Sequence, residues 1–489
     1  MGMRSCQLEP ILHHACVRPL TVRPRPLSLE PCTGTDVCQR SADEETLRHA
    51  SQGGLARMTK PRVSFLTFGC RVNQYETDMM RALLAADCVL VDGRADIYVL
   101  NGCSVTGLAE KKARQAVHRI RVASPRAVVL LTGCLADAVA RGMVPFEPVD
   151  AVAGNAWKTR LPEVVARVLA GERGLFPPAL PRPLDEEASS GPSGRVRAYL
   201  KVEDGCSGVC TYCHAVQLRG QPRSKSLRAA VTEAERLVGA GFPEIVLTGV
   251  NLAEYSTPEG KLPTLVRSLL RIRDLVRLRL ASLNVAGVTD SLLDVFAEDA
   301  RLCPHFHSPL QTGSDHVLRA MRRPYTVAAY RAAVAQIRNR LPDATFGTDL
   351  IVGFPGEDEA AFAATCRIVE EVGFANLHAF RFSLRPGTDA AGLRLAAVPE
   401  SVKRDRADRL AAVWHPVRRR LLDARLGKVE DVLTEAEREG RFQGHSAGYL
   451  KVTFASDAQV PNATLCRVRV TGASDDGLEG VHDDQHRAG

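Results

Sequence analysis

The sequence predicts an α/β protein of several domains that ends in a small all-β barrel. From Arg62 onward, apolar runs of strand length alternate with helical patterns, which is typical of a parallel sheet covered by helices. A stretch rich in Pro, Gly and Ser at 174–194 divides this alternation into two series, as a linker between domains would. From about residue 428, polar and apolar residues alternate with Gly and Asp at the turns, which favours short β-strands.

The composition is that of a multidomain globular protein from a reducing compartment. Its 489 residues exceed what one hydrophobic core usually organises, and 45% apolar with 25% charged residues is ordinary for a globular chain. Neither an apolar run of roughly 18 residues nor a secretory segment is present, so we expect a cytoplasmic protein without a membrane partner. There the 14 cysteines favour metal sites over disulfides. The net charge of +8 permits a polyanionic partner without demonstrating one.

Residues 1–57 show no periodic apolar pattern, and their cysteines stand at no ligand-like spacing. We interpret them as a disordered extension or as a misassigned start, with Met58 as the true first residue. A first α/β domain is expected at 62–170, followed by a linker at 171–197. Its strands are expected at 63–68, 97–101 and 128–133, and its helices at 73–86, at 106–122 and up to Leu169.

A second α/β domain is expected at 198–426. Six strands, each followed by a helix, predict an open or closed (β/α) barrel, which places its chemistry at the carboxyl ends of the strands. The expected strands are 199–202, 244–249, 277–282, 305–311, 345–354 and 377–383. The expected helices are 227–240, 262–273, 289–298, 314–339, 357–372 and a long basic helix at 399–426. A small all-β barrel at 427–482 and a tail at 483–489 complete the chain.

The segment GCSGVCTYC offers Cys206, Cys210 and Cys213 directly after the first strand of the expected barrel. A short loop can wrap three such thiolates around one iron–sulfur cube, which leaves one iron open to an external ligand. A structural zinc or a disulfide is the alternative, and zinc would need a fourth ligand, for which His214 is the local candidate. The position at the end of a barrel strand favours the cluster.

Three more cysteines follow strand ends in the first domain: Cys70 in FGCRVNQYE, Cys103 in LNGCSVT and Cys134 in TGCLAD. Neighbouring strand ends of a parallel sheet converge on one edge, so three loops there offer three thiolates to one point. Each of these cysteines follows a glycine, which allows the backbones to approach closely. The alternative is three unrelated core cysteines. We favour a second iron–sulfur cluster.

The C-x3-C-x2-C loop after a barrel strand resembles the radical-SAM superfamily. The resemblance implies that the open iron chelates S-adenosylmethionine (SAM), and that one electron cleaves its sulfonium to give a 5′-deoxyadenosyl radical. It also implies SAM contacts at strand ends. These are Tyr212 near the adenine, Thr248, Gly249 and Asn251 in LTGVN near the methionine amino group, and Asp349 with the IVGFPGE run at 351–357.

The order of a three-Cys domain, a radical-SAM core and a β-rich end is similar to that of the methylthiotransferase family over nearly all of residues 62–482. Such enzymes insert a sulfur and then a methyl group at an unactivated C–H. The resemblance implies a flavodoxin-like N-terminal domain, a partial (β/α)6 TIM-type barrel and a C-terminal TRAM barrel. It implies two [4Fe–4S] clusters as well, one that cleaves SAM and one that holds or supplies the sulfur, with a second SAM as methyl donor.

Four phrases are most similar to the family branch that acts on N6-threonylcarbamoyladenosine in tRNA. They are GCRVNQYE (69–76), LCPHFHSPLQTGSD (302–315), MRRPYT (321–326) and GTDLIVGFPGE (347–357). The chain departs from the family pattern at 214–218, where an apolar pair and Pro–Tyr are usual, and at 281–289, where an acidic–proline pair is expected. Neither departure removes a cluster ligand, so both concern the shape of the substrate pocket.

Several other residues carry weaker predictions. His305 and His307 alternate on a strand and face one side, as pocket lining or as hydrogen-bonded structural groups. The arginines at 418–420 lie on the basic helix, where they form a solvated face or a track for phosphates. RNA contact by the net-acidic β-segment is expected from an exposed Tyr449 and from Lys451, Arg467 and Arg469.

The sequence therefore predicts a tRNA methylthiotransferase that acts on threonylcarbamoyladenosine beside the anticodon. Its expected partners are the tRNA, an electron donor such as flavodoxin or ferredoxin, and a sulfur donor. One alternative keeps the chemistry and changes the substrate to isopentenyladenosine tRNA or to a ribosomal protein side chain. A more distant alternative is a non-catalytic iron–sulfur electron carrier, which would need four thiolates for each cluster.

Overall fold

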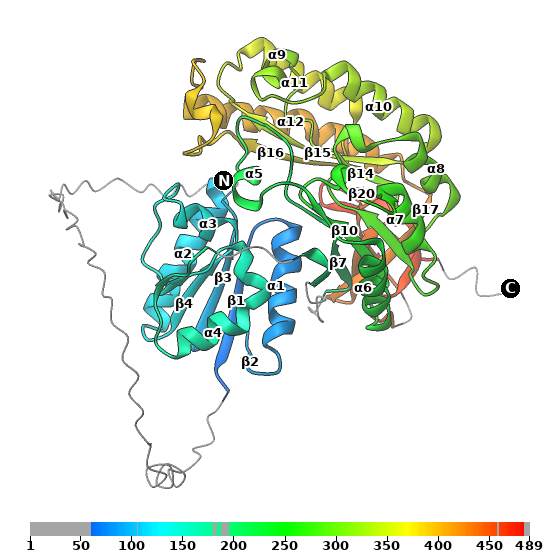
Figure 1. Cartoon of the computed structure of the whole chain (residues 1–489). Coiled ribbons are helices and arrows are strands. Elements are labelled where there is room, and N and C mark those ends of the chain that lie inside the picture. The colour runs from blue at the N-terminus through cyan, green and yellow to red at the C-terminus, as the bar shows by residue number, and fades with distance from the viewer. Residues whose placement is uncertain (1–59, 105, 179–182, 187–194, 457–458, 484–489) are drawn as a thin grey trace, which may run out of the picture. The chain divides into compact units, whose positions relative to one another are not determined.

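Figure 1 shows the computed structural model, which describes residues 60–104, 106–178, 183–186, 195–456 and 459–483. The sequence predictions for residues 1–57 and for the tail beyond 483 lie outside the described residues. In the part of the chain that is described, no helix is long and apolar enough to cross a membrane.

The first α/β unit is a six-stranded parallel sheet with helices on both faces (Figure 1). The strand order β2-β1-β3-β4-β5-β6 confirms a flavodoxin-like arrangement, with the switch of strand order between β1 and β3. Apolar side chains of α1 and α4 form one core cluster, and those of α2 and α3 form a second cluster on the opposite face. The elements are β1 (Arg62–Phe68), α1 (Arg71–Leu84), β2 (Val89–Leu90), β3 (Ile97–Gly102), α2 (Gly107–Ala123), β4 (Val128–Thr132), α3 (Cys134–Ala140), β5 (Ala151–Val152), α4 (Leu161–Leu169) and β6 (Gly174–Leu175).

The second α/β unit is an open barrel of six parallel strands in chain order. Two three-stranded sheets, β7-β10-β13 and β14-β15-β16, are joined by bridges between Leu278 and Leu302 and between Ser282 and His307. Among the described residues β7 and β16 do not pair, so the predicted barrel is partial, and α1 contacts β7 at its open edge. The strands are β7 (Arg197–Lys201), β10 (Glu244–Thr248), β13 (Arg277–Leu280), β14 (His305–His307), β15 (Thr345–Val352) and β16 (Asn376–Arg381).

Helices cover the outer face of this barrel, and two short ribbons lie in its loops. The helices are α5 (Ala215–Arg219), α6 (Leu227–Gly239), α7 (Leu262–Leu270), α8 (Asp290–Glu298), α9 (Asp315–Ala320), α10 (Val327–Arg340), α11 (Glu359–Val372) and α12 (Glu400–Asp423). The ribbons are β8 (Glu203–Asp204) with β9 (Arg223–Ser224), and β11 (Ser256–Thr257) with β12 (Gly260–Lys261).

The helix predicted at 314–339 is wrong as a single element, because the structure divides it into α9 and α10. Pro324 lies in the break, where it has no N–H to donate and disfavours a helical conformation at Arg323. Arg322 adopts a left-handed backbone with φ of 54°. Helix α10 then begins at Val327, and the side chain of the preceding Thr326 accepts a hydrogen bond from the Ala329 N–H.

The inner face of the barrel is polar. Successive side chains of a strand point to opposite faces, and one set, for example Leu200, Leu278 and Phe306, packs in the main core beneath the helices. The other set is buried as well, but it is charged or polar. From β7, β13 and β14 it comprises Arg197, Lys201, Arg277, Arg279, His305 and His307.

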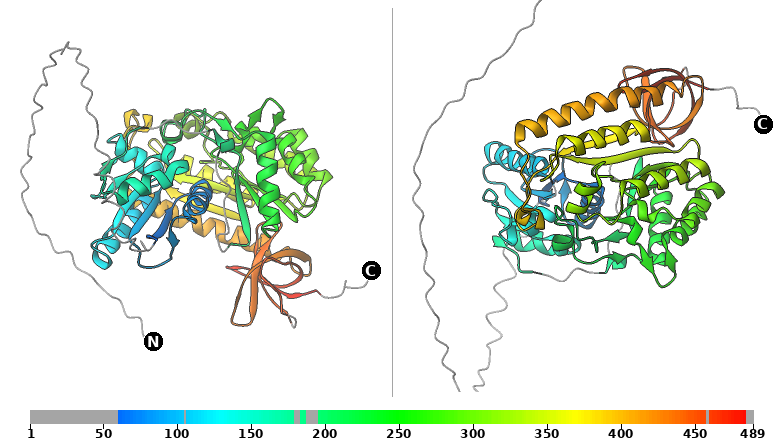
Figure 2. Two further views of the ribbon diagram at one scale, coloured as in Figure 1. Left: turned by 60° about the horizontal axis from the view of Figure 1, so that its bottom comes forward. Right: turned by 90° about the horizontal axis from the view of Figure 1, so that it is seen from above.

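The chain ends in a closed five-stranded barrel with the order β17-β18-β19-β21-β20, which confirms the predicted all-β barrel. The long helix α12 leads into it (Figure 2). Its strands are β17 (Val429–Arg438), β18 (Arg441–Ser446), β19 (Lys451–Ala455), β20 (Leu465–Ser474) and β21 (Gly477–His482).

Tyr449, in the turn between β18 and β19, lies against the amino ends of the barrel strands. Its ring centre is 4.8 Å from the Arg279 guanidinium, 5.8 Å from that of Arg197 and 5.3 Å from the centre of the His305 ring. The prediction of an exposed Tyr449 is therefore wrong, because the ring is half-buried among these side chains. The alternation of residues in a strand does not predict the burial of a residue in a turn. Tyr449 has a φ of 59°, so its side chain does not follow the strand pattern.

Candidate active site

The barrel triad, Cys206, Cys210 and Cys213, lies in the loop between β8 and α5, and all three side chains are partly exposed. The sulfurs lie near one another. A Cβ built on Gly208 would be 3.1 Å from Cys206 Sγ and 3.8 Å from Cys210 Sγ. Glycine at this position thus leaves open the space between the sulfurs, which a shared metal group would occupy.

Hydrogen-bond donors surround the barrel triad. Cys206 and Cys213 each accept a hydrogen bond from a backbone N–H, at 3.2 and 3.4 Å, and Cys210 accepts one from Arg323 at 3.3 Å. Desolvation raises the pKa of Cys206 to about 12 and also raises the pKa of Cys213. Thiolates at this site therefore need a bound cation, and three adjacent cysteines with donors to their sulfurs fit an iron–sulfur cluster.

Arg323 was missed by the sequence analysis. It lies in the break between α9 and α10, and its Nε donates to Tyr325 Oη at 3.0 Å. Its Nη2 donates to Asn284 Oδ1 at 3.3 Å, so the 281–289 stretch that departs from the family pattern supports the barrel triad through Arg323. The signal in the sequence was Pro324, which marks a loop near the cluster where a continuous helix was predicted.

The residues predicted to contact SAM at the end of β10 lie beside the barrel triad. Thr248 is the last residue of β10, and a Cβ on Gly249 would be only 2.6 Å from Glu203 Oε2. The Asn251 N–H donates to the same carboxylate oxygen at 2.7 Å. Glu254 accepts a hydrogen bond from the backbone N–H that follows Cys206, at 2.9 Å. Sequence reasoning missed both acids, which bring the β10 end and the cysteine loop together.

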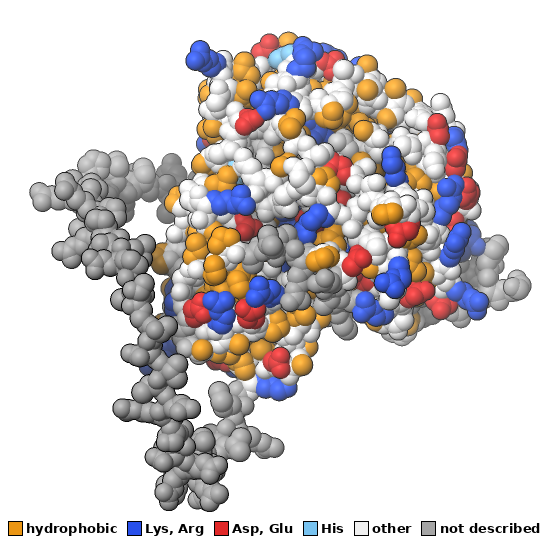
Figure 3. All heavy atoms as spheres, in the orientation of Figure 1, with side chains coloured by type: hydrophobic (Ala, Val, Ile, Leu, Met, Phe, Trp, Pro, Cys, Tyr) orange, Lys and Arg blue, Asp and Glu red, His pale blue; other side chains and the backbone are white. Residues whose placement is uncertain are grey.

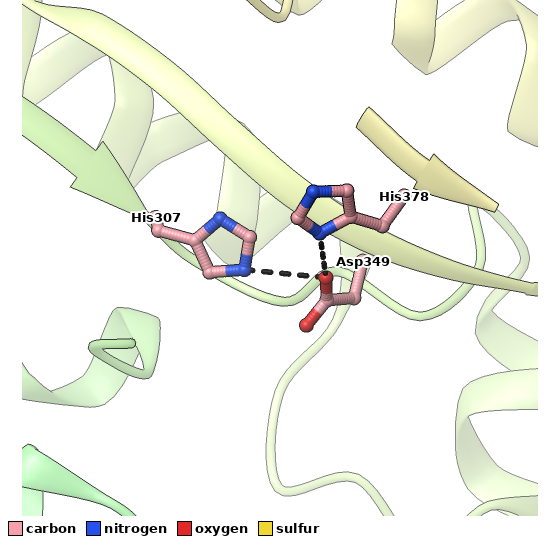
Figure 4. A group of neighbouring side chains, drawn as sticks. All are labelled: His307, Asp349 and His378. Atoms are coloured by element: carbon pink, nitrogen blue, oxygen red, sulfur yellow. Dashed lines mark hydrogen bonds and ion pairs between the residues drawn. The ribbon is translucent and has the colours of Figure 1, made fainter. Parts of the chain in front are cut away.

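Tyr212 and Asp349, also predicted to contact SAM, lie in two different places. Tyr212 packs edge-on against Phe354, with ring centres 6.4 Å apart, at the turn after β15. Asp349 lies within β15 instead, where its Oδ1 is 3.2 Å from His307 Nε2 and 3.0 Å from His378 Nδ1. Figure 4 shows these three side chains converging from three neighbouring strands.

His307, Asp349 and His378 form a group of metal-type ligands among the described residues. Its ligand atoms lie within 4.8 Å of one another. Although desolvation acts to raise it, the hydrogen bonds from the two histidines hold the pKa of Asp349 below its usual range. The carboxylate is thus ionised and both rings point an N–H at it, so His307 is a hydrogen-bonded group of the inner face.

The first-domain triad, Cys70, Cys103 and Cys134, follows β1, β3 and β4 as predicted. These strands are paired in register up to their carboxyl ends, so the three loops leave the sheet side by side. A Cβ on Gly69 would be 2.9 Å from Cys103 Cβ, which explains why glycine precedes the first cysteine. Cys103 and Cys134 are buried, whereas Cys70 is exposed and open to an external group.

Electrostatics couple the two triads. Although Cys70 has exposed surface, the dense protein around its sulfur raises the pKa of the thiol, which Arg219 lowers and the Cys134 sulfur raises further. Desolvation raises the pKa of Cys213 in the barrel triad, and the Cys134 sulfur contributes to that rise. The carboxyl edge of the first sheet therefore faces the cysteine loop of the barrel.

Arg219 joins the first-domain triad to the segment that follows the barrel triad. It ends α5, just after the barrel triad, and its Nε lies 3.2 Å from Cys134 Sγ. Its Nη1 donates to Glu76 at 2.8 Å and to Asp204 at 2.9 Å. Although Arg219 is desolvated, the charges of Cys134, Glu76 and Asp204 hold its pKa well above the usual value. A single buried guanidinium thus links the first sheet to the barrel loop.

Two lysines complete this buried network. Lys158 pairs with Glu76, and Lys201 lies 3.4 Å from both Glu76 and Asp204. Arg223 also pairs with Asp204, at 3.3 Å, so with Arg219 four cations surround Glu76 and Asp204. Metal ligation by Cys134 would require its thiolate, which would then lie beside the Arg219 guanidinium.

Comparisons with known proteins agree with this two-part site. Residues 62–154 match the family described as Uncharacterized protein family UPF0004, and residues 200–369 match the Radical SAM superfamily. Threonylcarbamoyladenosine tRNA methylthiotransferase MtaB from Thermotoga maritima is 38% identical over 421 residues, which cover 84% of this chain and 95% of that protein. The chain belongs to the radical-SAM methylthiotransferase family.

Two further members differ in the substrates that their names state. The MtaB protein of Bacillus subtilis is 32% identical over 80% of this chain and 90% of its own length. The tRNA-2-methylthio-N(6)-dimethylallyladenosine synthase of Novosphingobium aromaticivorans is 34% identical over 81% of this chain and 91% of its own length. As a radical-SAM methylthiotransferase, the protein is an enzyme that uses SAM and [4Fe–4S] clusters.

The methylthiotransferase should become less stable as Glu203 ionises. Burial raises the pKa of Glu203 to about 8 from 4.5, and Asp204 and Glu254 raise it further, although the Asn251 N–H lowers it. The folded state thus holds the proton more tightly than the unfolded state. The stabilisation is complete below about pH 4.5 and is lost as the pH rises through about 8, so the free energy of unfolding should fall by about 2 kcal/mol between about pH 6 and about pH 8.

Anaerobic urea unfolding of the wild type and of Glu203→Gln at these two pH values checks this result. The variant carries a neutral side chain of the same shape, so it should lack the Glu203 part of the pH dependence. An identical pH dependence in both proteins would contradict a neutral Glu203.

Proposed function

We propose that the protein is a tRNA methylthiotransferase that adds a methylthio group to N6-threonylcarbamoyladenosine next to the anticodon. The observation that carries the proposal is the contact of Arg219 with Cys134, because it brings a sulfur-handling triad to the loop that would bind SAM. The threonylcarbamoyl substrate is supported by the names of the Thermotoga and Bacillus relatives and by the polar inner face of the barrel.

The six cysteines would divide the work between two clusters. Cys206, Cys210 and Cys213 would hold one [4Fe–4S] cluster together with SAM, near Tyr212, Thr248, Gly249, Asn251 and Asp349, and Cys70, Cys103 and Cys134 would hold the other. When bound, the first cluster supplies the electron that cleaves SAM, and the second holds the sulfur to be transferred. One arginine contacts a sulfur of each triad. Arg219 would stabilise a thiolate at Cys134, and Arg323 donates a hydrogen bond to Cys210.

Three regions would contribute to this function, namely 62–170 with the sulfur-handling triad, 198–426 with the SAM-binding loop, and 427–482 as the TRAM-like barrel. The reaction also requires an electron donor, such as flavodoxin or ferredoxin, and a sulfur donor. Because the clusters and unpaired thiols suit a reducing compartment, we place the enzyme in the cytoplasm.

Not all of the arginines of α12 that were predicted to contact tRNA are available for such a contact. Arg418 is half-buried, donates to the backbone carbonyls of Ala375 and Asp475, and has a pKa lowered by desolvation, so it belongs to the fold. Arg420 is exposed, as is Arg467 on β20. On the face shown in Figure 3 basic and acidic side chains are interspersed, so tRNA contact there would rest on individual arginines.

A direct assay tests the substrate. Purified enzyme with reductant, SAM and a sulfur source is offered tRNA that carries threonylcarbamoyladenosine, tRNA that carries isopentenyladenosine, and a ribosomal protein. We expect a methylthio product, detected by nucleoside mass spectrometry, only from the first. The Novosphingobium relative makes the isopentenyl-type substrate the second candidate. Equal reaction with that tRNA, or reaction with the ribosomal protein alone, would refute the threonylcarbamoyl assignment.

A further inference from the structure

We propose that Arg71 binds the carboxylate of the threonylcarbamoyl group and so selects this nucleoside over uncharged relatives. The proposal rests on the proposed function, and it assigns a specificity-determining side chain within it. Arg71 is the first residue of α1 and directly follows Cys70, so it stands at the sulfur-handling triad.

The surroundings of Arg71 are cationic and aromatic. Its side chain is half-buried, its Nη2 donates to Tyr449 Oη at 3.4 Å, and its guanidinium carbon is 5.6 Å from the centre of the Tyr449 ring. Among the described residues no acidic side chain pairs with Arg71. The C-terminal barrel thus contributes one aromatic ring, Tyr449, that contacts the Arg71 guanidinium and also lies against Arg197, Arg279 and His305 of the radical-SAM barrel.

The region around Tyr449 carries an excess of positive charge. Besides Arg71, it includes Arg197, Arg277 and Arg279, whose ion pairs among the described residues are made with only two carboxylates. These carboxylates are Glu244, which pairs with all three, and Glu435, which pairs with Arg197. Burial lowers the pKa of the neighbouring His305 well below its usual value, so this ring adds no charge near neutral pH.

Four guanidinium groups thus face two carboxylates in a region that is partly or fully buried. Buried cations in proteins are normally paired, because removing them from water is costly. The glutamates lie with Arg197, Arg277 and Arg279, which leaves Arg71 as the cation that lacks an acid. An anion from outside the chain is therefore expected at Arg71, and a planar carboxylate matches the two-pronged donor geometry of arginine.

The other cations near the two triads already have partners. Arg219 and Lys201 are ion-paired with Glu76 and Asp204. Arg323 donates to the sulfur of Cys210 and to two further side chains. Arg71 is thus the basic residue at the triads that remains for a substrate.

The chemistry of the nucleoside favours the threonine carboxylate as this anion. The name of the Novosphingobium relative places the methylthio group of its product at position 2 of the adenine. If this enzyme reacts there too, the reacting carbon and the N6 substituent share one edge of the purine. An adenine placed for sulfur transfer near Cys70 would then carry the threonyl carboxylate toward the adjacent Arg71. An isopentenyl group has no charge for Arg71 to bind.

Binding and kinetics with a matched pair of RNAs test the proposal. The first RNA is an anticodon stem-loop with threonylcarbamoyladenosine, and the second is the same stem-loop with the threonine carboxylate converted to a carboxamide. An unmodified stem-loop reports phosphate contacts alone. For each RNA, the Kd is measured by fluorescence anisotropy, and KM and kcat for methylthiolation are measured separately.

The wild type should bind the carboxylate RNA about 10- to 100-fold more tightly than the carboxamide RNA, as expected for charge-assisted hydrogen bonds. In Arg71→Gln the ratio of the two affinities should fall to about one, because the Kd and KM of the carboxylate RNA rise. Arg71→Lys should keep part of the preference. Iron content, thermal stability and 5′-deoxyadenosine formation should stay at wild-type levels in both variants.

Arg81→Gln is the matched control, because Arg81 is also a partly exposed arginine of α1, where it pairs with Asp92 at 3.7 Å. It should keep the wild-type preference. A wild-type preference in Arg71→Gln would overturn the proposal, and so would an equal loss of affinity for all three RNAs, which would indicate a phosphate contact. If the wild type fails to methylthiolate the carboxylate RNA at all, the proposed function itself fails.

Discussion

Replacing Cys206, Cys210 and Cys213 together by Ala should abolish SAM cleavage and lower the iron content from about eight to about four atoms per chain. The reason is that these three thiols are the expected cluster ligands, and burial raises the pKa of Cys206 to about 12, so its sulfur is ionised only with a bound metal group. Without the three thiols the loop has no other ligand set. His214, the local candidate for a fourth ligand, already contacts the Pro386 carbonyl through its Nε2 at 2.9 Å.

Anaerobic reconstitution, iron analysis and quantification of 5′-deoxyadenosine measure this outcome. Cys366→Ala is a suitable control, because Cys366 is a partly buried cysteine of α11 and belongs to neither triad. It should retain the full iron content and SAM cleavage. If the intact protein binds only about four irons, the two-cluster assignment is wrong; if the triple variant still cleaves SAM, these cysteines are not the ligands.

Repeating local patterns explain what the sequence predicted well. In the first domain, every apolar run that was predicted to be a strand forms a strand. A buried parallel strand needs apolar residues on both faces, so such runs are easily recognised. The strands of the barrel could be predicted equally well. The cysteines could be assigned to the ends of strands, because each follows directly after an apolar run. The α/β fold class followed from the alternation of strands and helices.

Contacts between distant segments were not predictable in this way. Arg219 carried no functional prediction, yet its guanidinium joins Cys134 to two buried acids. Tyr449 was expected to be exposed, because nothing local shows that the turn of one barrel packs on the strands of another. Asp349 was assigned to the strand end, whereas the two histidines that bind it come from neighbouring strands.

The charged groups at the domain junction have a common physical origin. A sulfur that must stay ionised in a desolvated place needs nearby cations, and those cations need acids to hold them. Arg219, Lys158 and Lys201 with Glu76 and Asp204 form such a set around Cys134. Sequence patterns report which face of an element is buried, but they do not report which charges meet there.

Changing Cys70, Cys103 or Cys134 singly to Ala should stop methylthiolation while SAM cleavage to 5′-deoxyadenosine continues. Only the barrel triad would hold the cluster that cleaves SAM, and the groups that donate to its sulfurs, two backbone N–H groups and Arg323, do not come from the first sheet. Methylthio product should fall below about one-hundredth of the wild-type amount, because a three-ligand site loses its metal group with any ligand.

The three variants should differ in stability. Cys70 is exposed, so Cys70→Ala should unfold close to the wild-type midpoint, whereas Cys134→Ala removes the sulfur that lies beside the buried Arg219 and should be destabilised by about 1–3 kcal/mol. Product mass spectrometry, iron content and anaerobic urea unfolding separate these effects. Retained methylthiolation in any one variant would exclude that cysteine from the sulfur-handling site.

Cys88→Ala, in the core of the same domain, is the control for a general disturbance of the fold and should leave the product yield unchanged.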